Sequence, residues 1–380
     1  LDVMLTGKNV YPKPARRMGL VDALIHRPGL VDAAVTAARR LADGTLVPDR
    51  NGPAALPEKV LESNPLTRRL VYQQAEARVL KETKGNYPAP LRIVACVRTG
   101  LEDGLDAGLD AEARGFADLV FTPESRQLVF LFFAQQAGRK NPWKDAARPV
   151  DTVGVVGAGL MGAGIAEVSA GSDLDVLLKD RDLHLAAKGK QKVWQGISRR
   201  AKKGALSAFE RDVAVARVTP VADYAPFAGA GLVVEAAPED LDLKRRVLAD
   251  VEAVAGPQTV FASNTSSIPI ARLAESSRRP ETVVGMHYFS PVPQVPLLEI
   301  VRTPATPDWV LGTAYDVGLR QGKTVVVVND GPGFYTTRIL AAYMNEALRL
   351  VREGARIEQV DRAMVQFGFP MGPFALFDLV

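Results

Sequence analysis

Cysteine and histidine are scarce in this sequence. Its single cysteine, Cys96, excludes an internal disulfide framework and indicates a reducing compartment. Only three histidines occur in 380 residues, so each is a candidate for proton chemistry near neutral pH. No apolar run reaches the length of a membrane span, and no signal-like segment follows Leu1. Because the first residue is not Met, we interpret the chain as an internal piece of a longer protein.

A strong charge of either sign is also missing. The net charge of +4 and the pI of about 9.1 are mildly basic, which points to an anionic ligand or surface. Basic and aromatic residues are not interleaved, and no zinc-finger or RNA-binding signature occurs. We therefore predict no nucleic-acid partner and no metal site.

The first 148 residues combine short elements with longer helical patterns. We predict strand, helix, strand and helix over residues 1–40, with the strands at "LDVMLTG" and "LVDALI". The segment from Gly44 to Pro57 is rich in Gly, Pro and Asp, which predicts a linker. Helical patterns follow over 58–98 and 111–137. Basic residues outnumber Glu in 58–98, so this stretch is either a solvated helix face or a contact with an anionic membrane.

The composition changes after Pro149. Strand-like runs at "TVGVV", "GLVVEAA", "TVFAS", "TVVGMH" and "TVVVVND" alternate with helical segments. This alternation predicts an α/β fold with a doubly wound parallel sheet. After "DGPGF" the pattern is helical to the last residue.

A glycine-rich turn follows the first of these strands. Gly157, Gly159 and Gly162 form a GxGxxG motif that opens a helix, and Asp180 ends the next strand. Such a turn brings a pyrophosphate to a helix N-terminus, and the acid binds a ribose 2′-hydroxyl, which favours NAD. Arg181, beside Asp180, leaves NADP open.

Three polar residues are candidates for alcohol oxidation. His287 follows a strand, Glu299 lies beyond a proline-rich loop that can return the chain beside it, and Ser266 ends another strand. Removal of a hydroxyl proton needs a base near neutral pKa, and a carboxylate on the other ring nitrogen orients that base. Ser266 could hold the substrate oxygen, although serine clusters at strand ends are equally helix caps.

Five motifs carry a specific resemblance. "GAGLMGAGIA", "FASNTSS", "GMHYFSP…LLEIV", "DGPGFYTTR" and "FGFPMGP" occur in the order found in L-3-hydroxyacyl-CoA dehydrogenases. "LTGK…ARRMGLVDALI" is similar to the end of an enoyl-CoA hydratase (crotonase) domain, and "KETKGNYPAPLRIV" resembles the linker between the two activities. The chain thus resembles the α subunits of multifunctional fatty-acid β-oxidation enzymes. It looks closest to the mitochondrial trifunctional branch, with the bacterial α subunits as the near alternative.

The resemblance implies four regions. Residues 1–40 would be a crotonase tail, 41–148 a helical linker, 149–331 an NAD-binding Rossmann domain, and 332–380 the start of an all-α C-terminal dehydrogenase domain. We interpret that last domain as truncated, and we expect the catalytic glutamates of the hydratase before Leu1.

The resemblance also implies residue roles. His287 would be the catalytic base, oriented by Glu299, with Ser266 beside the nicotinamide and the substrate hydroxyl. Ser290 and Thr337 would contact the substrate, at positions where single-function relatives have Asn. The implied cofactor contacts are Gly157, Gly159, Met161, Gly162, Asp180, Glu239, Lys244 and Ser266.

The implied activity is the NAD-dependent oxidation of (3S)-3-hydroxyacyl-CoA to 3-ketoacyl-CoA, in a parent chain that also hydrates enoyl-CoA. The implied partner is a 3-ketoacyl-CoA thiolase β subunit, in the mitochondrial matrix or at its inner membrane, with the bacterial cytoplasm as the alternative. Two other functions stay open. One is a β-hydroxyacid dehydrogenase for free acids, which would use a lysine base. The other is a scaffold that contacts a membrane and the thiolase.

Overall fold

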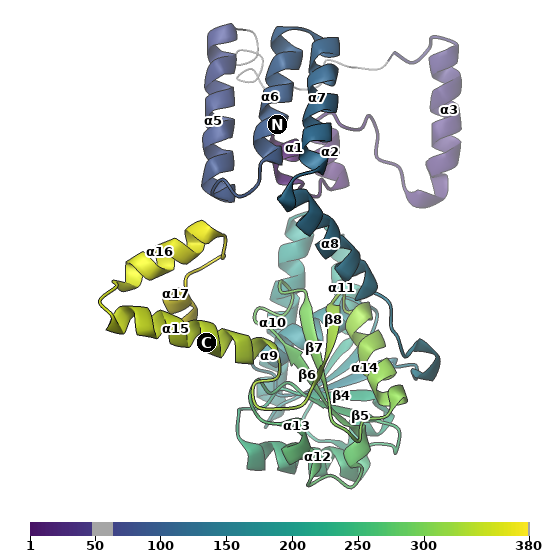
Figure 1. Ribbon diagram of the computed structural model, residues 1–380. Helices are drawn as coiled ribbons and strands as arrows, with labels where there is room; N and C mark the ends of the chain where they lie inside the picture. The colour runs from purple at the N-terminus through teal and green to yellow at the C-terminus, as the bar shows by residue number, and fades with distance from the viewer. Residues whose placement is uncertain (48–63, 379–380) are drawn as a thin grey trace. The chain divides into compact units, whose positions relative to one another are not determined.

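The computed structural model describes residues 1–47 and 64–378, so most of the linker predicted from Gly44 to Pro57 lies outside the described residues. The chain forms two compact units (Figure 1). One unit comprises residues 130–354. The other combines residues 1–129 with 355–380.

The 130–354 unit is built on one eight-stranded sheet with the order β3-β2-β1-β4-β5-β6-β7-β8. All neighbouring strands are parallel except β6 and β7, which pair antiparallel. The strands are β1 (Thr152–Val156), β2 (Asp175–Lys179), β3 (Val218–Val221), β4 (Leu232–Glu235), β5 (Val260–Ser263), β6 (Val283–Tyr288), β7 (Leu297–Arg302) and β8 (Thr324–Asn329). The predicted Rossmann-type sheet is confirmed, and β3 and the antiparallel β7 extend it.

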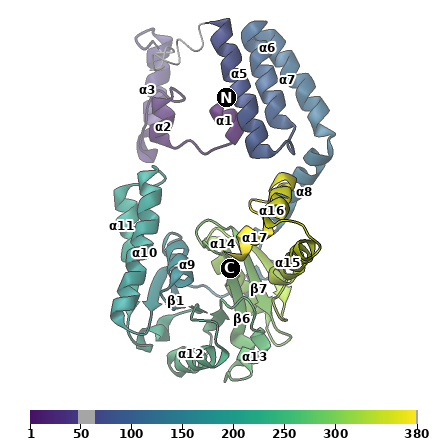
Figure 2. The same cartoon turned by 90° about the vertical axis from the view of Figure 1, so that its left-hand side faces the viewer.

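Helices cover both faces of this sheet because the strands are buried on both sides. Figure 2 shows α9 and α10 side by side on one face, with α12 on the other. The helices of the unit are α9 (Leu160–Ala170), α10 (Leu183–Lys202), α11 (Ala208–Ala216), α12 (Leu241–Val254), α13 (Ile270–Ala274), α14 (Asp308–Arg320) and α15 (Thr336–Arg352), with short 3-10 turns at Lys144–Ala146, Ala225–Gly229 and Pro280–Thr282.

The sheet order places the ligand crevice. The chain runs outward from β1 to β3 and then restarts on the other side of β1 with β4. In such a sheet, ligands bind beyond the carboxyl ends of the strands where the order reverses. The turn after β1 and the ends of β4, β5 and β6 all reach this edge.

The other unit contains helices and no strand in its described residues. It contains α1 (Asp2–Thr6), α2 (Pro12–Arg17), a 3-10 turn (Arg27–Gly29), α3 (Leu30–Ala42), α5 (Pro65–Thr83), α6 (Ala89–Glu102), α7 (Leu105–Val120), α16 (Ile357–Phe367) and α17 (Pro373–Phe377). α6 and α7 cross closely, because a Cβ on Gly108 would lie 2.6 Å from the Cα of Gly100.

Two local predictions were wrong in this unit. "LDVMLTG" is the helix α1 rather than a strand, and "LVDALI" is irregular. Both segments are short apolar runs. Such a run can be a strand or a buried helical turn, so periodicity alone cannot separate these two structures. The helical pattern over 111–137 is two helices, α7 and α8 (Pro123–Ala137), with a turn between them.

Several basic residues of the 58–98 stretch have acidic partners. Arg92 pairs with Asp118 and Arg98 with Glu76, at 3.5 and 3.9 Å. Within the described ranges, no helix is long and apolar enough to cross a membrane.

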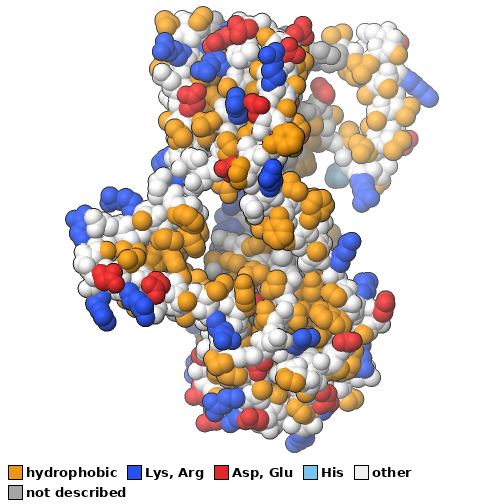
Figure 3. All heavy atoms as spheres, in the orientation of Figure 1, with side chains coloured by type: hydrophobic (Ala, Val, Ile, Leu, Met, Phe, Trp, Pro, Cys, Tyr) orange, Lys and Arg blue, Asp and Glu red, His pale blue; other side chains and the backbone are white. Residues whose placement is uncertain are grey.

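In the 130–354 unit, Figure 3 shows hydrophobic side chains on the surface of α15. The exposed hydrophobic residues of this helix include Ile339, Leu348 and Leu350.

Candidate active site

His287 and Glu299 face each other across an antiparallel pair of strands. The register of β6 and β7 sets the two residues directly opposite, and His287 Nδ1 lies 2.8 Å from Glu299 Oε2. Only 6% of His287 and 0% of Glu299 is exposed. The rings of Phe289 and Phe334 lie 4.4 and 5.8 Å from the imidazole, between ring centres. The twelve-residue spacing in the sequence is therefore a hairpin that brings base and carboxylate together.

Glu299 has further donors that the sequence did not indicate. The backbone N–H of Thr336 donates to Oε1 at 3.0 Å, and its hydroxyl donates to Oε2 at 2.8 Å. Burial by itself would raise the pKa of Glu299, but the hydrogen bonds from His287 and Thr336 outweigh burial and lower it. The carboxylate is thus ionised at neutral pH. Nδ1 of His287 then carries the proton, which leaves Nε2 as the basic nitrogen.

The glycine-rich turn has the shape that a dinucleotide needs. Gly157 has φ of 98°, and a Cβ there would lie 2.5 Å from the carbonyl oxygen of Ala236. A Cβ on Gly162 would lie 1.7 Å from the carbonyl oxygen of Gly157, so α9 can approach the turn only with glycine there. Gly159 has open space where a Cβ would be, and it starts α9 without a side-chain cap. Free N–H groups at this helix N-terminus fit a pyrophosphate.

Asp180 lies directly beyond β2, beside this turn. Its carboxylate accepts hydrogen bonds from the backbone N–H groups of Ala158 and Arg181, both at 2.7 Å. These bonds orient the carboxylate where a ribose would lie and place a negative charge that disfavours a 2′-phosphate. Met161 packs against the core through its apolar side chain.

Glu239 holds the loop that carries Ser266. Its Oε1 accepts from the Thr265 hydroxyl, from the N–H of Ser266 at 3.2 Å, and from the N–H and hydroxyl of Ser267 at 3.3 and 3.0 Å. Burial would raise the pKa of Glu239, but these bonds and the ammonium of Lys244 lower it. The Ser266 hydroxyl makes no hydrogen bond to the residues that the structure describes, so it is available to a ligand.

Lys244 lies beneath this loop and is only 1% exposed. Its ammonium donates to Glu235 Oε1 at 2.8 Å and to the carbonyl of Ala237 at 3.1 Å, and Glu235 also accepts from Ser263. The structure therefore gives Lys244 an internal partner, the buried carboxylate at the end of β4. Its direct contact with the cofactor stays a prediction.

Each of the two predicted substrate contacts lies close along the chain to a residue of the dyad or to its support. Ser290 is exposed just beyond β6, in the loop that follows His287. Thr337 is half-buried in the first turn of α15, next to the Thr336 that binds Glu299. Thr336, rather than Thr337, donates hydrogen bonds to the carboxylate of Glu299.

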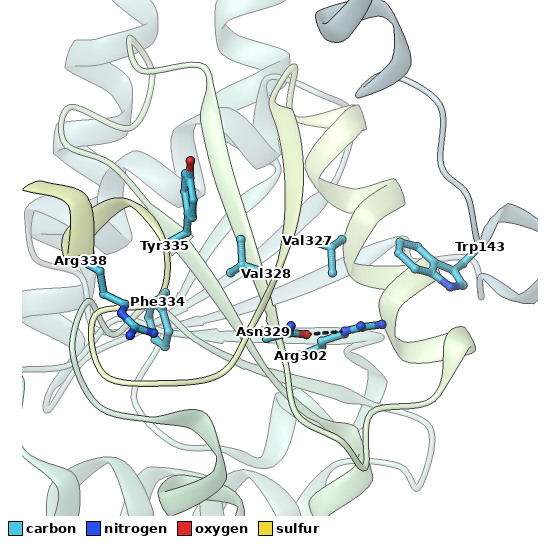
Figure 4. A pocket seen from close by; sticks show the side chains of 8 residues that line it. All are labelled: Trp143, Arg302, Val327, Val328, Asn329, Phe334, Tyr335 and Arg338. Carbon is cyan, nitrogen blue, oxygen red and sulfur yellow. Dashed lines mark hydrogen bonds between the residues drawn. The ribbon is translucent and has the colours of Figure 1, made fainter.

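A cleft of about 480 Å³ lies beside Phe334, one of the two aromatic rings that pack on His287 (Figure 4). Phe334, which packs on His287, also lines this cleft. Arg302 donates through Nε to Asn329 Oδ1 at 3.0 Å. The residues around the cleft are Trp143, Arg302, Val327, Val328, Asn329, Phe334, Tyr335 and Arg338.

The turn after β1, Asp180 and the His–Glu dyad define a dinucleotide-dependent dehydrogenase. Comparison with known proteins gives the family. Residues 152–331 match the NAD binding domain of 3-hydroxyacyl-CoA dehydrogenase, and residues 333–380 match the C-terminal domain of the same enzyme. The chain belongs to the 3-hydroxyacyl-CoA dehydrogenase family, whose cofactor is NAD.

Three relatives illustrate the match. The fatty acid oxidation complex subunit alpha of Shewanella frigidimarina is 42% identical over 100% of this chain and 53% of its own length. The crystal structure of FadB2 from M. tuberculosis is 38% identical with a TM-score of 0.59, covering 61% of this chain and 83% of that one. (S)-3-hydroxybutyryl-CoA dehydrogenase PaaH1 from Ralstonia eutropha is 36% identical with a TM-score of 0.59, covering 61% and 82%. The chain thus spans about half the length of the curated Shewanella relative.

Proposed function

We propose that this chain oxidises (3S)-3-hydroxyacyl-CoA to 3-ketoacyl-CoA with NAD, the dehydrogenation step of fatty-acid β-oxidation. The observation that carries the proposal is the buried dyad of His287 and Glu299, with Nδ1 and Oε2 2.8 Å apart. A buried, oriented imidazole with a free Nε2 is the general base that oxidation of a secondary alcohol requires.

Each group in the site has a separate role in this reaction. NAD, when bound at the turn after β1, supplies the hydride acceptor. His287 Nε2 takes the proton from the C3 hydroxyl, and Glu299 stabilises the imidazolium that forms. The free hydroxyl of Ser266 holds the substrate oxygen, and Phe289 and Phe334 limit the access of water to the ring.

A basic cleft favours a CoA thioester over a free acid. α9, α10 and the loop after Ser290 surround about 480 Å³ of space. Lys192, Arg199 and Arg200 of α10 line it together with Lys203 just beyond the helix, and in the described part of the chain none of them has an ion-pair partner. Unpaired cations fit the phosphates of CoA.

The lysine-based alternative has less support in the site. Lys244 and Lys323 are buried, but Lys244 is bound to Glu235 and Lys323 to the carbonyls of Val292 and Val295. Neither ammonium is left free to act as a base.

We also propose that the parent protein hydrates enoyl-CoA and works in a multi-subunit assembly, because the Shewanella relative is named as one subunit of a fatty acid oxidation complex. The thiolase partner, the membrane contact of the basic helices, the trifunctional branch and a mitochondrial or bacterial location stay predictions.

The test is NADH formation from an L-3-hydroxyacyl-CoA by the full-length protein, its His287→Ala variant and a His26→Ala control. His26 is exposed in the other unit. Loss of a positioned base should lower kcat by about 10²- to 10⁴-fold with NADH binding intact. If the wild type binds NADH but oxidises no thioester, the scaffold alternative replaces the proposal.

A further inference from the structure

Glu235 is a buried carboxylate at the end of β4 that the proposed reaction does not use. It is 0% exposed. Its Oε1 accepts hydrogen bonds from the N–H of Ala237 at 2.7 Å and from the ammonium of Lys244 at 2.8 Å, and its Oε2 accepts from the hydroxyl of Ser263 at 2.6 Å. Replacing a buried ion pair by apolar side chains of similar volume is often neutral or stabilising, so stability alone does not explain this pair.

Glu235 lies on the same face of the sheet as the catalytic dyad. In the register of the strands, Glu235 pairs with Ser263, and Ser263 pairs with Gly285. Side chains two residues apart on a strand point to the same face, so His287 shares the face of Gly285. The strand residues two positions before this row all pack in one cluster with α12 and α13, and they are Val233, Phe261 and Val283. The carboxylate and the base are therefore on one side of the sheet.

Lys244 connects Glu235 to the loop that carries Ser266. Its ammonium lies between two carboxylates, that of Glu235 at 2.8 Å and Oε2 of Glu239 at 3.4 Å. Oε1 of Glu239 in turn accepts from the backbone N–H groups of Ser266 and Ser267. The backbone at Ser266 is thus held by a chain of contacts that begins at Glu235.

Glu235 fixes the position of the ammonium. Its side chain is fully buried, whereas 40% of the Glu239 side chain is exposed. If Glu235 had no charge, Glu239 would be the only ionic partner of Lys244 within the described residues. The ammonium would then be anchored to a side chain that is itself free to turn towards solvent.

We propose that Glu235 is a positioning residue of the dehydrogenase. It holds the ammonium of Lys244, which holds Glu239 against the loop, and so it fixes the Ser266 hydroxyl at the substrate oxygen. The inference rests on the proposed function, in which Ser266 binds that oxygen.

The first test is Glu235→Gln in the full-length protein. The amide oxygen still accepts from Ala237 and Lys244, and the amide NH₂ group can donate to Ser263, so the substitution removes mainly the charge. A neutral acceptor binds an ammonium more weakly than a carboxylate does, so kcat for a 3-hydroxyacyl-CoA should fall about five- to tenfold. The affinity for NADH should stay within about threefold, because the turn after β1 is unchanged.

The matched control is Glu275→Gln, just beyond α13. It removes an exposed carboxylate that pairs with Arg245 at 3.3 Å, and it should leave kcat unchanged.

A Ser266→Ala background separates positioning from a general loss of packing. If Glu235 acts through Ser266, Glu235→Gln should lower kcat less than about twofold once the Ser266 hydroxyl is absent. A general loss of packing would lower kcat by the same factor in both backgrounds.

Hydrogen exchange measures the loop without any turnover. In Glu235→Gln the peptide that covers residues 264–268 should exchange faster than in the wild type and in Glu275→Gln, whereas β4 and β6 should exchange as before. If Glu235→Gln does not fold, the double variant Glu235→Gln/Lys244→Met replaces it, because it buries no unpaired charge. It also removes the ammonium from Glu239, so the same faster exchange is expected.

Three results would overturn the proposal. They are a kcat of Glu235→Gln that matches the Glu275→Gln control, an equal loss in the Ser266→Ala background, and unchanged exchange over residues 264–268. If the wild type oxidises no thioester, it is the proposed function that fails, and the exchange measurement still shows whether Glu235 holds the loop.

Discussion

Thr336→Val tests whether the hydroxyl of Thr336 supports the catalytic carboxylate. Glu299 has three donors, at 2.8 Å from His287, 3.0 Å from the N–H of Thr336 and 2.8 Å from its hydroxyl. Valine has nearly the shape of threonine and keeps the N–H, so the substitution removes one donor and little else. The change is therefore confined to Oε2, the atom that also holds His287.

The magnitude follows from the kind of bond that is lost. A hydrogen bond to a charged group contributes about 1.5–3 kcal/mol. Two donors remain on Glu299, so we expect the lower end, about 1.5 kcal/mol, which is roughly tenfold in kcat. The KM for NAD should not change, because the hydroxyl that is removed bonds to Glu299 and not to the turn after β1.

The pH profile separates this role from a general loss of packing. The bond from the Thr336 hydroxyl helps to keep the pKa of Glu299 below its ordinary value of 4.5, so the variant should have a higher pKa at Glu299. The acidic limb of kcat/KM should then move to higher pH. Because the pKa of Glu299 is lower in the folded than in the unfolded protein, the ionised carboxylate stabilises the fold at pH values above its unfolded-state pKa. This stabilisation is lost as the pH falls through the folded-state pKa. The difference in unfolding free energy between the two proteins should therefore shrink towards pH 4.

The assay is NADH formation between pH 5 and 9, with urea unfolding at pH 7 and pH 4. Thr219→Val, on the exposed face of β3, is the matched control. A kcat within twofold of the wild type, with an unmoved acidic limb, would refute the argument that the hydroxyl supports Glu299.

Three further predictions concern the cofactor site and a buried lysine. Gly162→Ala should weaken NADH binding at least tenfold, because its Cβ would lie 1.7 Å from the carbonyl oxygen of Gly157. Fluorescence titration measures this, and unchanged affinity would mean that α9 can move away. Asp180→Asn should lower the kcat/KM ratio of NAD to NADP about tenfold or more, and an unchanged ratio would exclude the carboxylate as the discriminating group. Burial lowers the pKa of Lys323 from 10.5 to about 8, so the folded protein binds fewer protons than the unfolded chain between these values. The stability of the wild type relative to Lys323→Met should then rise by about 3 kcal/mol across that window, and a flat difference in denaturation midpoints would contradict the pKa.

Local sequence was sufficient for the features that depend on local physics. The glycines at 157, 159 and 162 follow a buried strand, and only glycine allows the turn and the close approach of α9. Most strands of the sheet were predicted because strands buried on both faces read as continuous β-branched runs, whereas β3 and β7 were not predicted. The His287–Glu299 pair was also predicted, since the proline-rich loop indicated a return of the chain.

Features that depend on packing between distant segments were not predicted. The short apolar runs near the N-terminus had no periodicity to separate helix from strand. Thr336, 37 residues from Glu299 along the chain, belongs to the site only because the antiparallel β7 faces the start of α15. No motif in the sequence singled out Glu167 of α9, which is 7% exposed because α10 approaches it at Gly196. The sequence by itself determined the kind of cofactor and the two residues of the dyad, because these follow from short motifs. Tertiary structure alone decided which groups support the dyad and which carboxylate faces the basic cleft, because those contacts come from the packing of helices onto the sheet.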